Sequence, residues 1–524
     1  MLKIYKRGEF IIMIKVKKEE TIRENGITLV ALVITIIILL ILAGISIANL
    51  TQTGLFEKAQ EAKEKTENAQ AEENAILENY LAQINEITGN GYEKTLTDTS
   101  DTKPAQAKPA GTTVIESDLS KGIVIKDNSK NNEWTWVVVP KSIYSNPQYT
   151  VANENRSVTS ETDYEGIYNI LNKYASPYRE GKAGQGRYWT DEWYYWENSS
   201  STLYGYVEKI IADETEYEQA VSAGNLYINR AGIEATSGRY NINNKYYERN
   251  TNLTEEQAKN TTANSGLSLS DYTSNYKKML SSVYTNGGFW ISRYEAGIAK
   301  TNTDTTRETI SPVRYVYSAI TSESTDAVSQ ANRIPYNYVK CSEAQSLAGR
   351  MSPDTSKTCS LLFGIQWDLV CKYLEENTDL EIVDINSNSA TKNWGNYANN
   401  SITLKPNSRY CTSPSSSSGT WALYTVENDF ITLSNNVYKT NNDTNYKGLL
   451  TTGASEDANK MNIYDFAGNE WEFTLEHATS NSNYPCAYRG GSYYNTGSGS
   501  PASYRSDNTT SNSYSLVGFR STLY

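Results

Sequence analysis

The strongest constraint in the sequence is an uncharged apolar stretch close to its beginning. Residues 27–48 form a run of 22 residues without a charged side chain, and most of them are aliphatic. As an α-helix rising about 1.5 Å per residue, such a run spans roughly 33 Å, which matches the hydrocarbon core of a bilayer. Basic residues precede it, which favours a cytoplasmic N-terminus. We predict a single transmembrane helix over 27–50, with the bulk of the chain outside the cell membrane.

The residues around this stretch resemble the leader of type IV prepilins. A basic segment, 1–26, ends in Gly26, and the apolar run begins at Ile27. The resemblance implies cleavage between these two residues by a prepilin peptidase, and assembly with other pilins. Ala31 stands where the family usually has Glu, a residue linked to filament assembly, so incorporation into a pilus stays open. An uncleaved signal anchor is the alternative interpretation.

The segment after the membrane stretch is predicted to be a stem and then a linker. Ile76, Tyr80, Ile84 and Ile87 recur at helical spacing, which predicts an amphipathic stem helix over 51–88. Residues 89–113 contain two Lys-Pro steps, which favour an extended backbone. We expect this linker to hold an outer domain, 114–524, away from the stem.

The composition narrows the functional classes for this outer domain. The net charge of −12 argues against nucleic-acid binding, which depends on Lys and Arg neutralising phosphates. Only 38% of the residues are hydrophobic, but 41 tyrosines supply both apolar area and hydroxyl groups. One histidine and five cysteines without a C-x-x-C pair leave little material for a transition-metal site, while one or two disulfides remain open.

Local patterns predict an α+β domain with much irregular structure. Two strand-like runs around a polar turn predict a hairpin over 122–140, and alternation predicts a strand within 287–298. Helical spacing of apolar residues predicts helices over 161–175, 271–284, 342–351 and 365–376. A loop that enters a strand is predicted over 462–476.

A set of motifs near the C-terminus is the most specific feature of the outer domain. In "GNEWEFTL", Trp471 and Glu472 fall on opposite faces of a predicted strand. Two further motifs follow, and each predicts a tight corner beside an arginine: Arg489, Gly490 and Gly491, then Gly518, Phe519 and Arg520. Because a guanidinium satisfies a carboxylate with two bonds, we expect Arg489 or Arg520 to pair with an acid such as Glu472 below the surface.

These motifs resemble the formylglycine-generating enzyme (sulfatase-modifying factor) family. The resemblance rests on "IYDFAGNEWEFT", "YRGGSYY", "SYR" and "VGFR", with weaker agreement in "WTWVVVP", "GFWISRYEA" and "LFGIQWDLV". It implies a C-type lectin-like fold, with an insertion at about 141–286.

The catalytic groups of that family are not found in this sequence. One branch of the family uses paired cysteines near the C-terminus to hold copper, but no cysteine follows Cys486. Another uses three histidines to bind iron, and this chain has only His477. We therefore predict no enzyme activity and name no catalytic residue. An oxidoreductase of the formylglycine-generating type and a minor structural pilin are the alternatives to a binding protein.

The resemblance also suggests a structural calcium ion. Some members of the family bind calcium beside the Gly-Asn-x-Trp-Glu loop, which here implicates the carbonyl oxygens of Gly468 and Glu470 and the side chain of Glu472. Calcium accepts such mixed oxygen ligands. The alternative is that Glu472 only pairs with an arginine.

The segment between the two arginine corners is predicted to be a ligand-binding surface. In 492–515, 18 of 24 residues are Ser, Tyr, Asn or Thr. Antibody loops use the same residue types for recognition. The residues predicted to be displayed are Tyr493, Tyr494, Asn495, Tyr504, Ser506, Asp507, Asn508, Ser511, Asn512 and Tyr514. The segment resembles the variable region of diversity-generating retroelement proteins, and the expected partner is an extracellular protein or glycan. An ordinary Ser/Asn-rich loop is the alternative.

Overall fold

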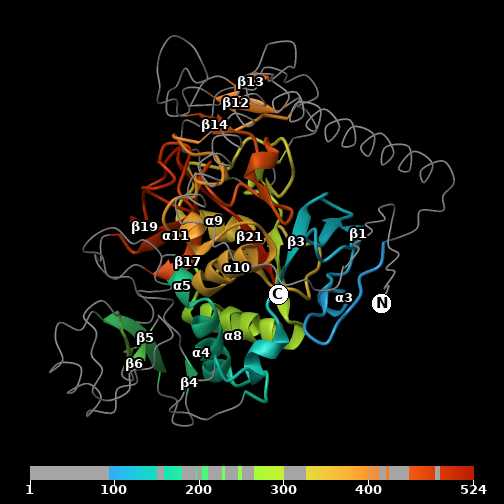
Figure 1. Cartoon of the computed structure of the whole chain (residues 1–524), viewed down its shortest axis with the longest axis vertical. Coiled ribbons are helices and arrows are strands. Elements are labelled where there is room, and N and C mark those ends of the chain that lie inside the picture. The colour runs from blue at the N-terminus through green and yellow to red at the C-terminus, as the bar shows by residue number, and fades with distance from the viewer. Residues whose placement is uncertain are drawn as a thin grey trace, which may run out of the picture. The chain divides into compact units, whose positions relative to one another are not determined.

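In the computed structural model, all described residues lie within Glu93–Tyr524. The structure describes residues 94–149, 158–179, 265–299, 326–400, 402–405, 408–411, 421–423, 448–477 and 484–524. It also describes the backbone of four short strands between 196 and 250 (Figure 1). The predicted leader (1–26, with Gly26), the membrane helix (27–50, with Ile27) and the stem helix (51–88) lie outside the described residues. Among the helices that the structure does describe, none has the length and apolar character needed to cross a bilayer.

A six-stranded antiparallel sheet holds the two ends of the described chain together. Its order is β1 (Thr112–Glu116), β2 (Val124–Asp127), β3 (Glu133–Val138), β8 (Gly288–Ser292), β21 (Ser521–Leu523) and β11 (Cys359–Leu361). β21, the last strand of the chain, pairs with β8 and β11. The predicted hairpin over 122–140 is confirmed by the pairing of β2 with β3.

A second sheet of four strands carries the C-terminal motifs. Its order is β19 (Arg505–Asn508), β18 (Cys486–Arg489), β17 (Trp471–His477) and β20 (Val517–Phe519). β17 runs parallel to β20 and antiparallel to β18. Only Arg520 separates β20 from β21, so the chain passes directly from this sheet into the six-stranded sheet.

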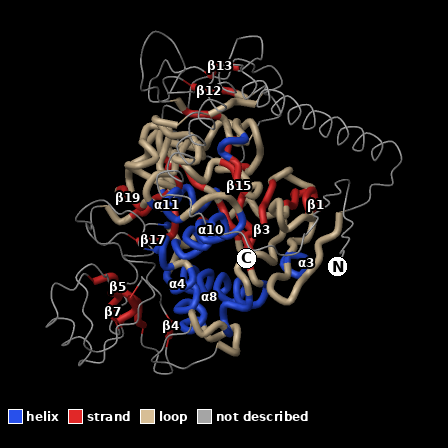
Figure 2. The backbone as a smooth tube through the Cα atoms, in the orientation of Figure 1, coloured by secondary structure: helices blue, strands red, loops and turns tan. Residues whose placement is uncertain are grey.

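Most of the main helices lie together as one group beside the strands of the two sheets (Figure 2). They are α4 (Tyr164–Tyr174), α5 (Ser176–Arg179), α8 (Leu269–Asn286), α9 (Cys341–Ala348), α10 (Gly364–Asn377) and α11 (Ile382–Asn386). α8 begins where the Ser268 side chain accepts a hydrogen bond from the Asp271 N–H, and it ends at Gly287 with φ 66°. α4, α8, α9 and α10 confirm the four helices predicted from periodicity. α10 contacts β3 of one sheet and β17 of the other.

Shorter elements complete the described fold. They are α3 (Pro104–Ala107), η1 (Lys141–Ser145), β9 (Gly297–Ile298), β10 (Ala327–Val328), β12 (Arg409–Cys411), β13 (Trp421–Leu423), β14 (Leu449–Leu450), η4 (Glu456–Ala458), β15 (Asn459–Lys460) and β16 (Ile463–Tyr464). A separate sheet has the order β4 (Trp196–Glu197), β5 (Leu203–Lys209), β7 (Tyr246–Asn250) and β6 (Tyr227–Asn229). The class is mixed α+β, as predicted, and the structure contains several antiparallel sheets.

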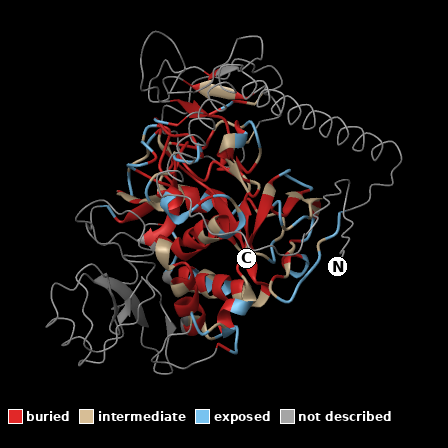
Figure 3. Cartoon of the chain, viewed as in Figure 1, coloured by how far each residue is buried: buried red, intermediate tan, exposed pale blue. Residues whose placement is uncertain are grey.

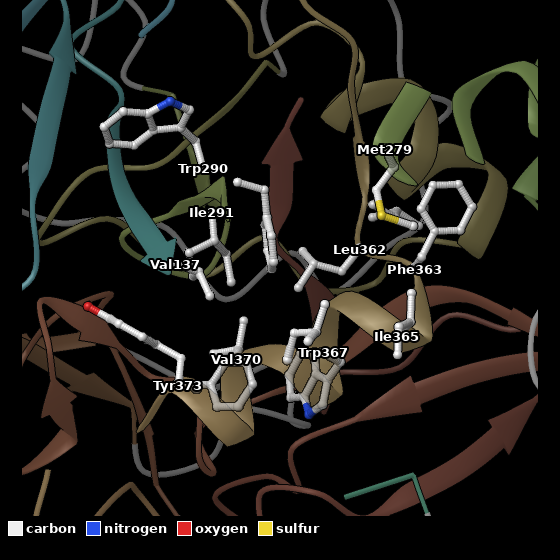
Figure 4. Close-up of a cluster of buried hydrophobic side chains, with 14 of the residues drawn as sticks. Val137, Met279, Trp290, Ile291, Leu362, Phe363, Ile365, Trp367, Val370 and Tyr373 are labelled. Atoms are coloured by element: carbon white, nitrogen blue, oxygen red, sulfur yellow. The ribbon is translucent and has the colours of Figure 1, made fainter. Parts of the chain in front are cut away.

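The core is rich in aromatic side chains. The rings of Trp136 and Trp290 lie 4.9 Å apart on neighbouring strands. Figure 4 shows Val137 and Ile291 of the six-stranded sheet facing α10. The elements around α10 are largely buried (Figure 3).

The predicted linker, 89–113, differs from the structure from residue 94 onward. Instead of an extended spacer, this segment forms α3 and the start of β1 and packs on the domain. The indole N–H of Trp136 donates to Thr102 Oγ1 at 2.8 Å, and that of Trp290 donates to the Ala107 carbonyl at 3.1 Å. Two buried indoles need acceptors, and this Pro/Thr-rich segment supplies them.

Candidate functional site

The predicted ligand-binding surface, residues 492–515, which we call the display segment, is divided by strand β19. β19 pairs with β18 in antiparallel register, with Arg489 opposite Arg505 and Cys486 opposite Asn508. The segment therefore consists of a first loop, residues 492–504, and a second loop, residues 509–516, on either side of β19. β18 precedes the segment, β19 lies in its middle and β20 follows it, and all three strands belong to the four-stranded sheet.

The two paired arginines share two buried acids, and we call these four residues the arginine–acid network. Arg489 Nη1 donates to both carboxylate oxygens of Glu476, at 2.9 and 3.0 Å, and its Nη2 donates to Asp368. Arg505 donates to Glu476 Oε1 at 2.8 Å and to Asp368 Oδ2 at 2.9 Å. Each side chain is at most 2% exposed. Two positive and two negative charges are thus buried together with good geometry, which buried ions require.

The second arginine corner contains an ion pair with Glu472, for which the sequence left Arg489 and Arg520 open. Arg520 Nε lies 2.5 Å from Glu472 Oε2, and its Nη2 lies 2.6 Å from Oε1. Arg520 also donates to the carbonyls of Tyr464 and Ser292. Trp471, Glu472 and Phe473 pair along β20 with Val517, Gly518 and Phe519, which fixes the second loop's end. A Cβ on Gly518 would lie 2.3 Å from Glu470 Oε2.

The Arg-Gly-Gly corner needs its glycines for conformation and for space. Gly490 and Gly491 have φ values of 95° and 76°, in a region that side chains disfavour. A Cβ on Gly491 would lie 2.3 Å from the Ser500 carbonyl oxygen, within the first loop.

We therefore expect Gly491→Ala to lower the free energy of unfolding by about 2–5 kcal/mol. Left-handed backbone strain contributes about 1–2 kcal/mol and overpacking about 1–3 kcal/mol. Gly111→Ala is the matched control, because Gly111 has φ 72° but nothing lies within 4 Å of its Cβ position. Urea unfolding of both variants separates strain from overpacking. Equal losses in the two variants contradict the packing of the first loop on Gly491.

The first loop lies on the segment that follows α11. The Ala398 N–H donates to the Asn495 carbonyl at 2.8 Å, and the Gly497 N–H donates to Asn399 Oδ1 at 2.9 Å. The Ala502 N–H donates to Ser389 Oγ at 2.6 Å. Local sequence patterns could not connect these two segments, since about a hundred residues separate them.

The second loop is fastened beside a tyrosine with an unusual backbone. The Tyr338 N–H donates to the Tyr514 carbonyl at 3.0 Å, and Asn337 Nδ2 donates to the Ser515 carbonyl at 3.1 Å. Tyr338 has φ 52°, which is rare for an aromatic residue. Tyr338 could not be predicted from the sequence, because nothing in its local pattern signals this conformation.

The ten residues predicted to be displayed divide into three groups. Tyr494 (53% exposed), Ser511 and Tyr514 (46% exposed) are exposed. Asn495, Tyr504, Ser506, Asp507 and Asn512 are half-buried. Tyr493 and Asn508 are 3% and 2% exposed, so the prediction that they are displayed is wrong. Tyr493 packs with Cys411, Trp421 and Leu449, and Asn508 ends β19.

Glu472, the side chain predicted to bind calcium, does not fit that ion. Both carboxylate oxygens of Glu472 accept from the Arg520 guanidinium, so a second cation there would face a fixed positive charge. Gly468 instead makes a turn, with φ 73° and its N–H donating to the Gly490 carbonyl at 2.9 Å. The alternative reading, in which Glu472 pairs with an arginine, describes this site.

Three further carboxyl groups are buried close to the Arg520–Glu472 pair. Burial raises the pKa of Glu470 well above its usual range, the Asn337 side chain opposes this, and the carboxylates of Glu472 and Asp465 add to it. Burial also raises the pKa of Asp465 to about 6, although the Gly453 N–H opposes this. The pKa of Glu295 is raised by burial and then by Asp465 and Glu470.

We expect Glu470→Gln to stabilise the protein more at pH 8 than at pH 5. With a folded-state pKa above its unfolded value, Glu470 contributes stability below the unfolded pKa of about 4.3 and loses it as the pH rises through the folded pKa. A glutamine side chain does not titrate, so its contribution to stability does not change with pH. The free energy of unfolding of the variant, relative to that of the wild type, should therefore grow by at least about 1 kcal/mol from pH 5 to pH 8. Urea unfolding at both pH values measures this difference. An advantage that is constant with pH contradicts the raised pKa.

The groups that could carry catalysis are arranged as follows. All five cysteines lie among the described residues and are buried, and none is in a disulfide. Within the described residues, no three His, Cys, Asp or Glu side chains form a group that could hold a metal ion. In comparisons with known proteins, neither a family model nor a curated protein matches this chain.

Proposed function

We propose that this chain is a membrane-anchored, pilin-like protein of the cell surface whose C-type lectin-like domain binds an extracellular protein or glycan. The observation that carries the proposal is the arginine–acid network, because it fastens a Tyr/Ser/Asn-rich segment at its middle while Tyr494 and Tyr514 stay exposed. Rigid aromatic rings beside small polar side chains suit recognition of varied partners.

The order of the C-terminal motifs supports the lectin-like assignment. The Gly-Asn-Glu-Trp-Glu loop, the Arg-Gly-Gly corner and the Gly-Phe-Arg corner meet at one sheet, with Glu472 opposite both Arg489 and Gly518. The anchor rests on the sequence of residues 27–50. N-terminal sequencing of the mature protein tests the pilin-like part, and a mature chain beginning at Ile27 is the expected result. A near-copy of the coding segment for 489–524, found beside a reverse-transcriptase gene, would establish diversification.

Binding by this surface is tested with the variant Tyr494→Ala/Tyr514→Ala. The probes are a printed glycan array and a panel of immobilised extracellular proteins, on which the full-length chain is expected to select a small subset. Truncating two central aromatic side chains should weaken that binding at least about 10-fold. Tyr484→Ala is the matched control, since Tyr484 is 41% exposed but lies outside both loops. Equal binding by the double variant and the control contradicts the proposal.

A further inference from the structure

The first loop brings two asparagines and the exposed Tyr494 into one part of the surface. Asn495 directly follows Tyr494, and its carbonyl accepts from the Ala398 N–H at 2.8 Å. Asn399, the residue after Ala398, accepts from the Gly497 N–H through its Oδ1 at 2.9 Å. The loop and the segment that supports it therefore run next to each other, so both amide side chains belong to the same area.

Each of these two amides is held by its oxygen. Asn399 Oδ1 accepts from the Gly497 N–H, and Asn495 Oδ1 accepts from Ser492 Oγ at 2.6 Å. Within the described part of the chain, the Nδ2 groups of Asn399 and Asn495 have no hydrogen-bond partner. Asn399 is exposed and Asn495 is half-buried. An amide that is already oriented, with its NH2 group unused, donates to a hydroxyl-rich ligand at little further cost in ordering.

This area carries very little charge. In 492–515, the only charged residues are Arg505 and Asp507. Arg505 is 1% exposed and belongs to the arginine–acid network, and Asp507 is half-buried. In the supporting segment, 388–400, Lys392 is the only charged residue. Because carboxylate, sulfate and phosphate groups are recognised chiefly through Arg and Lys, the area suits a ligand without charge.

The exposed apolar area of the display segment is aromatic rather than aliphatic. Its exposed large hydrophobic residues are Tyr494 and Tyr514. The other exposed residues of the segment are small, and they are Thr496, Ser498, Gly499, Thr510 and Ser511. A protein–protein interface has a desolvated apolar core, which such small polar residues do not supply. A sugar ring instead stacks its C–H face on an aromatic ring, and its hydroxyl groups both donate and accept hydrogen bonds.

We propose that the first loop and the segment that supports it bind an uncharged sugar unit. Tyr494 supplies the ring on which the sugar stacks, and the amide nitrogens of Asn399 and Asn495 donate to the sugar hydroxyl groups. This inference rests on the proposed function, and it narrows the ligand from a protein or a glycan to an uncharged glycan.

A glycan array with matched charge states tests the class of ligand. The full-length chain, purified in detergent, is applied to an array on which each neutral glycan is printed beside its sialylated and its sulfated derivative. We expect binding to neutral glycans, with no stronger binding to the charged derivatives. Raising NaCl from about 50 to about 500 mM should change the affinity less than about 3-fold, because salt screens interactions between charges. Lys392→Met should bind the neutral glycans as the wild type does.

Two conservative substitutions test the site itself. Asn399→Asp and Asn495→Asp keep the oxygen that accepts from Gly497 or Ser492 but lose the Nδ2 donor. Each should weaken binding to the neutral glycan about 3- to 10-fold, the effect of a lost hydrogen bond. Ser387→Asp is the matched control for the added charge, since Ser387 is exposed and lies outside the first loop. Thermal unfolding of all three variants should match that of the wild type.

The results separate this inference from the proposed function. Stronger binding to sialylated or sulfated glycans, or an affinity that falls at least about 10-fold at the higher salt concentration, overturns the uncharged ligand. Binding to immobilised extracellular proteins but to no glycan also overturns it, and leaves the proposed function standing. Neutral-glycan binding that Asn399→Asp and Asn495→Asp leave unchanged overturns the site. A chain that binds neither glycans nor proteins overturns the proposed function together with this inference.

Discussion

Replacing Arg505 with methionine is expected to lower the free energy of unfolding by about 3–5 kcal/mol. The substitution keeps an apolar stem of similar length but removes the guanidinium that bonds Glu476 Oε1 and Asp368 Oδ2. Arg489 is then left to compensate two buried carboxylates, and an uncompensated charge in a nearly solvent-free site is strongly destabilising. Urea unfolding, followed by tryptophan fluorescence, measures the loss.

Arg350→Met is the matched control for this prediction. Arg350 pairs with Asp326 at 3.3 Å, but the two side chains are 43% and 35% exposed. An exposed pair contributes at most about 1 kcal/mol, since water solvates each partner when the other is removed. Similar losses for Arg505→Met and Arg350→Met would show that the network does not hold β19.

Replacing Arg520 with methionine is expected to cost about 3–5 kcal/mol at pH 8 and less at pH 5. Arg520 is the partner of Glu472 and also lowers the pKa of Asp465 and of Glu295. The wild-type pKa of Glu472 is already raised by burial, against the effect of Arg520. Without the guanidinium the pKa of Glu472 rises further. In the variant, the stability that Glu472 contributes is therefore present below its unfolded pKa and is lost as the pH rises through the raised folded pKa.

The double variant Glu472→Gln/Arg520→Met tests the cause of that loss. Removing both partners leaves no buried carboxylate at position 472, so the double variant should be more stable than Arg520→Met alone at pH 8. If the double variant is the less stable of the two, the loss comes from packing rather than from an uncompensated charge. Urea unfolding at pH 5 and 8 of the three proteins supplies the comparison.

The sequence pattern predicted the helices and strands whose formation depends on residues close to one another in the chain. The helix over 271–284 was predictable because Tyr272, Tyr276, Met279 and Leu280 share one face, and all four are buried. A buried pair of Glu472 with Arg489 or Arg520 was predicted because a guanidinium satisfies a carboxylate with two bonds. The choice of Arg520 depends on how β17 and β20 pair. The lectin-like architecture and the membrane anchor stay predictions.

Features that depend on distant contacts could not be predicted in the same way. Asp368 lies on α10, far in sequence from Arg489 and Arg505, and nothing in the helical pattern around it signals these partners. Tyr493 was predicted to be displayed because it lies in a polar segment. Its burial depends on Cys411, Trp421 and Leu449, which other parts of the chain bring into contact with it. The segment 94–113 was predicted to be a spacer because it shows no apolar periodicity. Its packing depends instead on accepting hydrogen bonds from two buried indoles that lie elsewhere in the chain.

Amide hydrogen exchange over residues 492–515 tests most directly whether the display segment is an ordered surface. The N–H groups of Tyr493, Ala502 and Ser503 donate to acceptors outside the two loops, and β19 is paired along its length. These amides should exchange at least about 100-fold more slowly than in an unstructured peptide of the same sequence. Exchange at the unstructured rate throughout 492–515 would contradict the account.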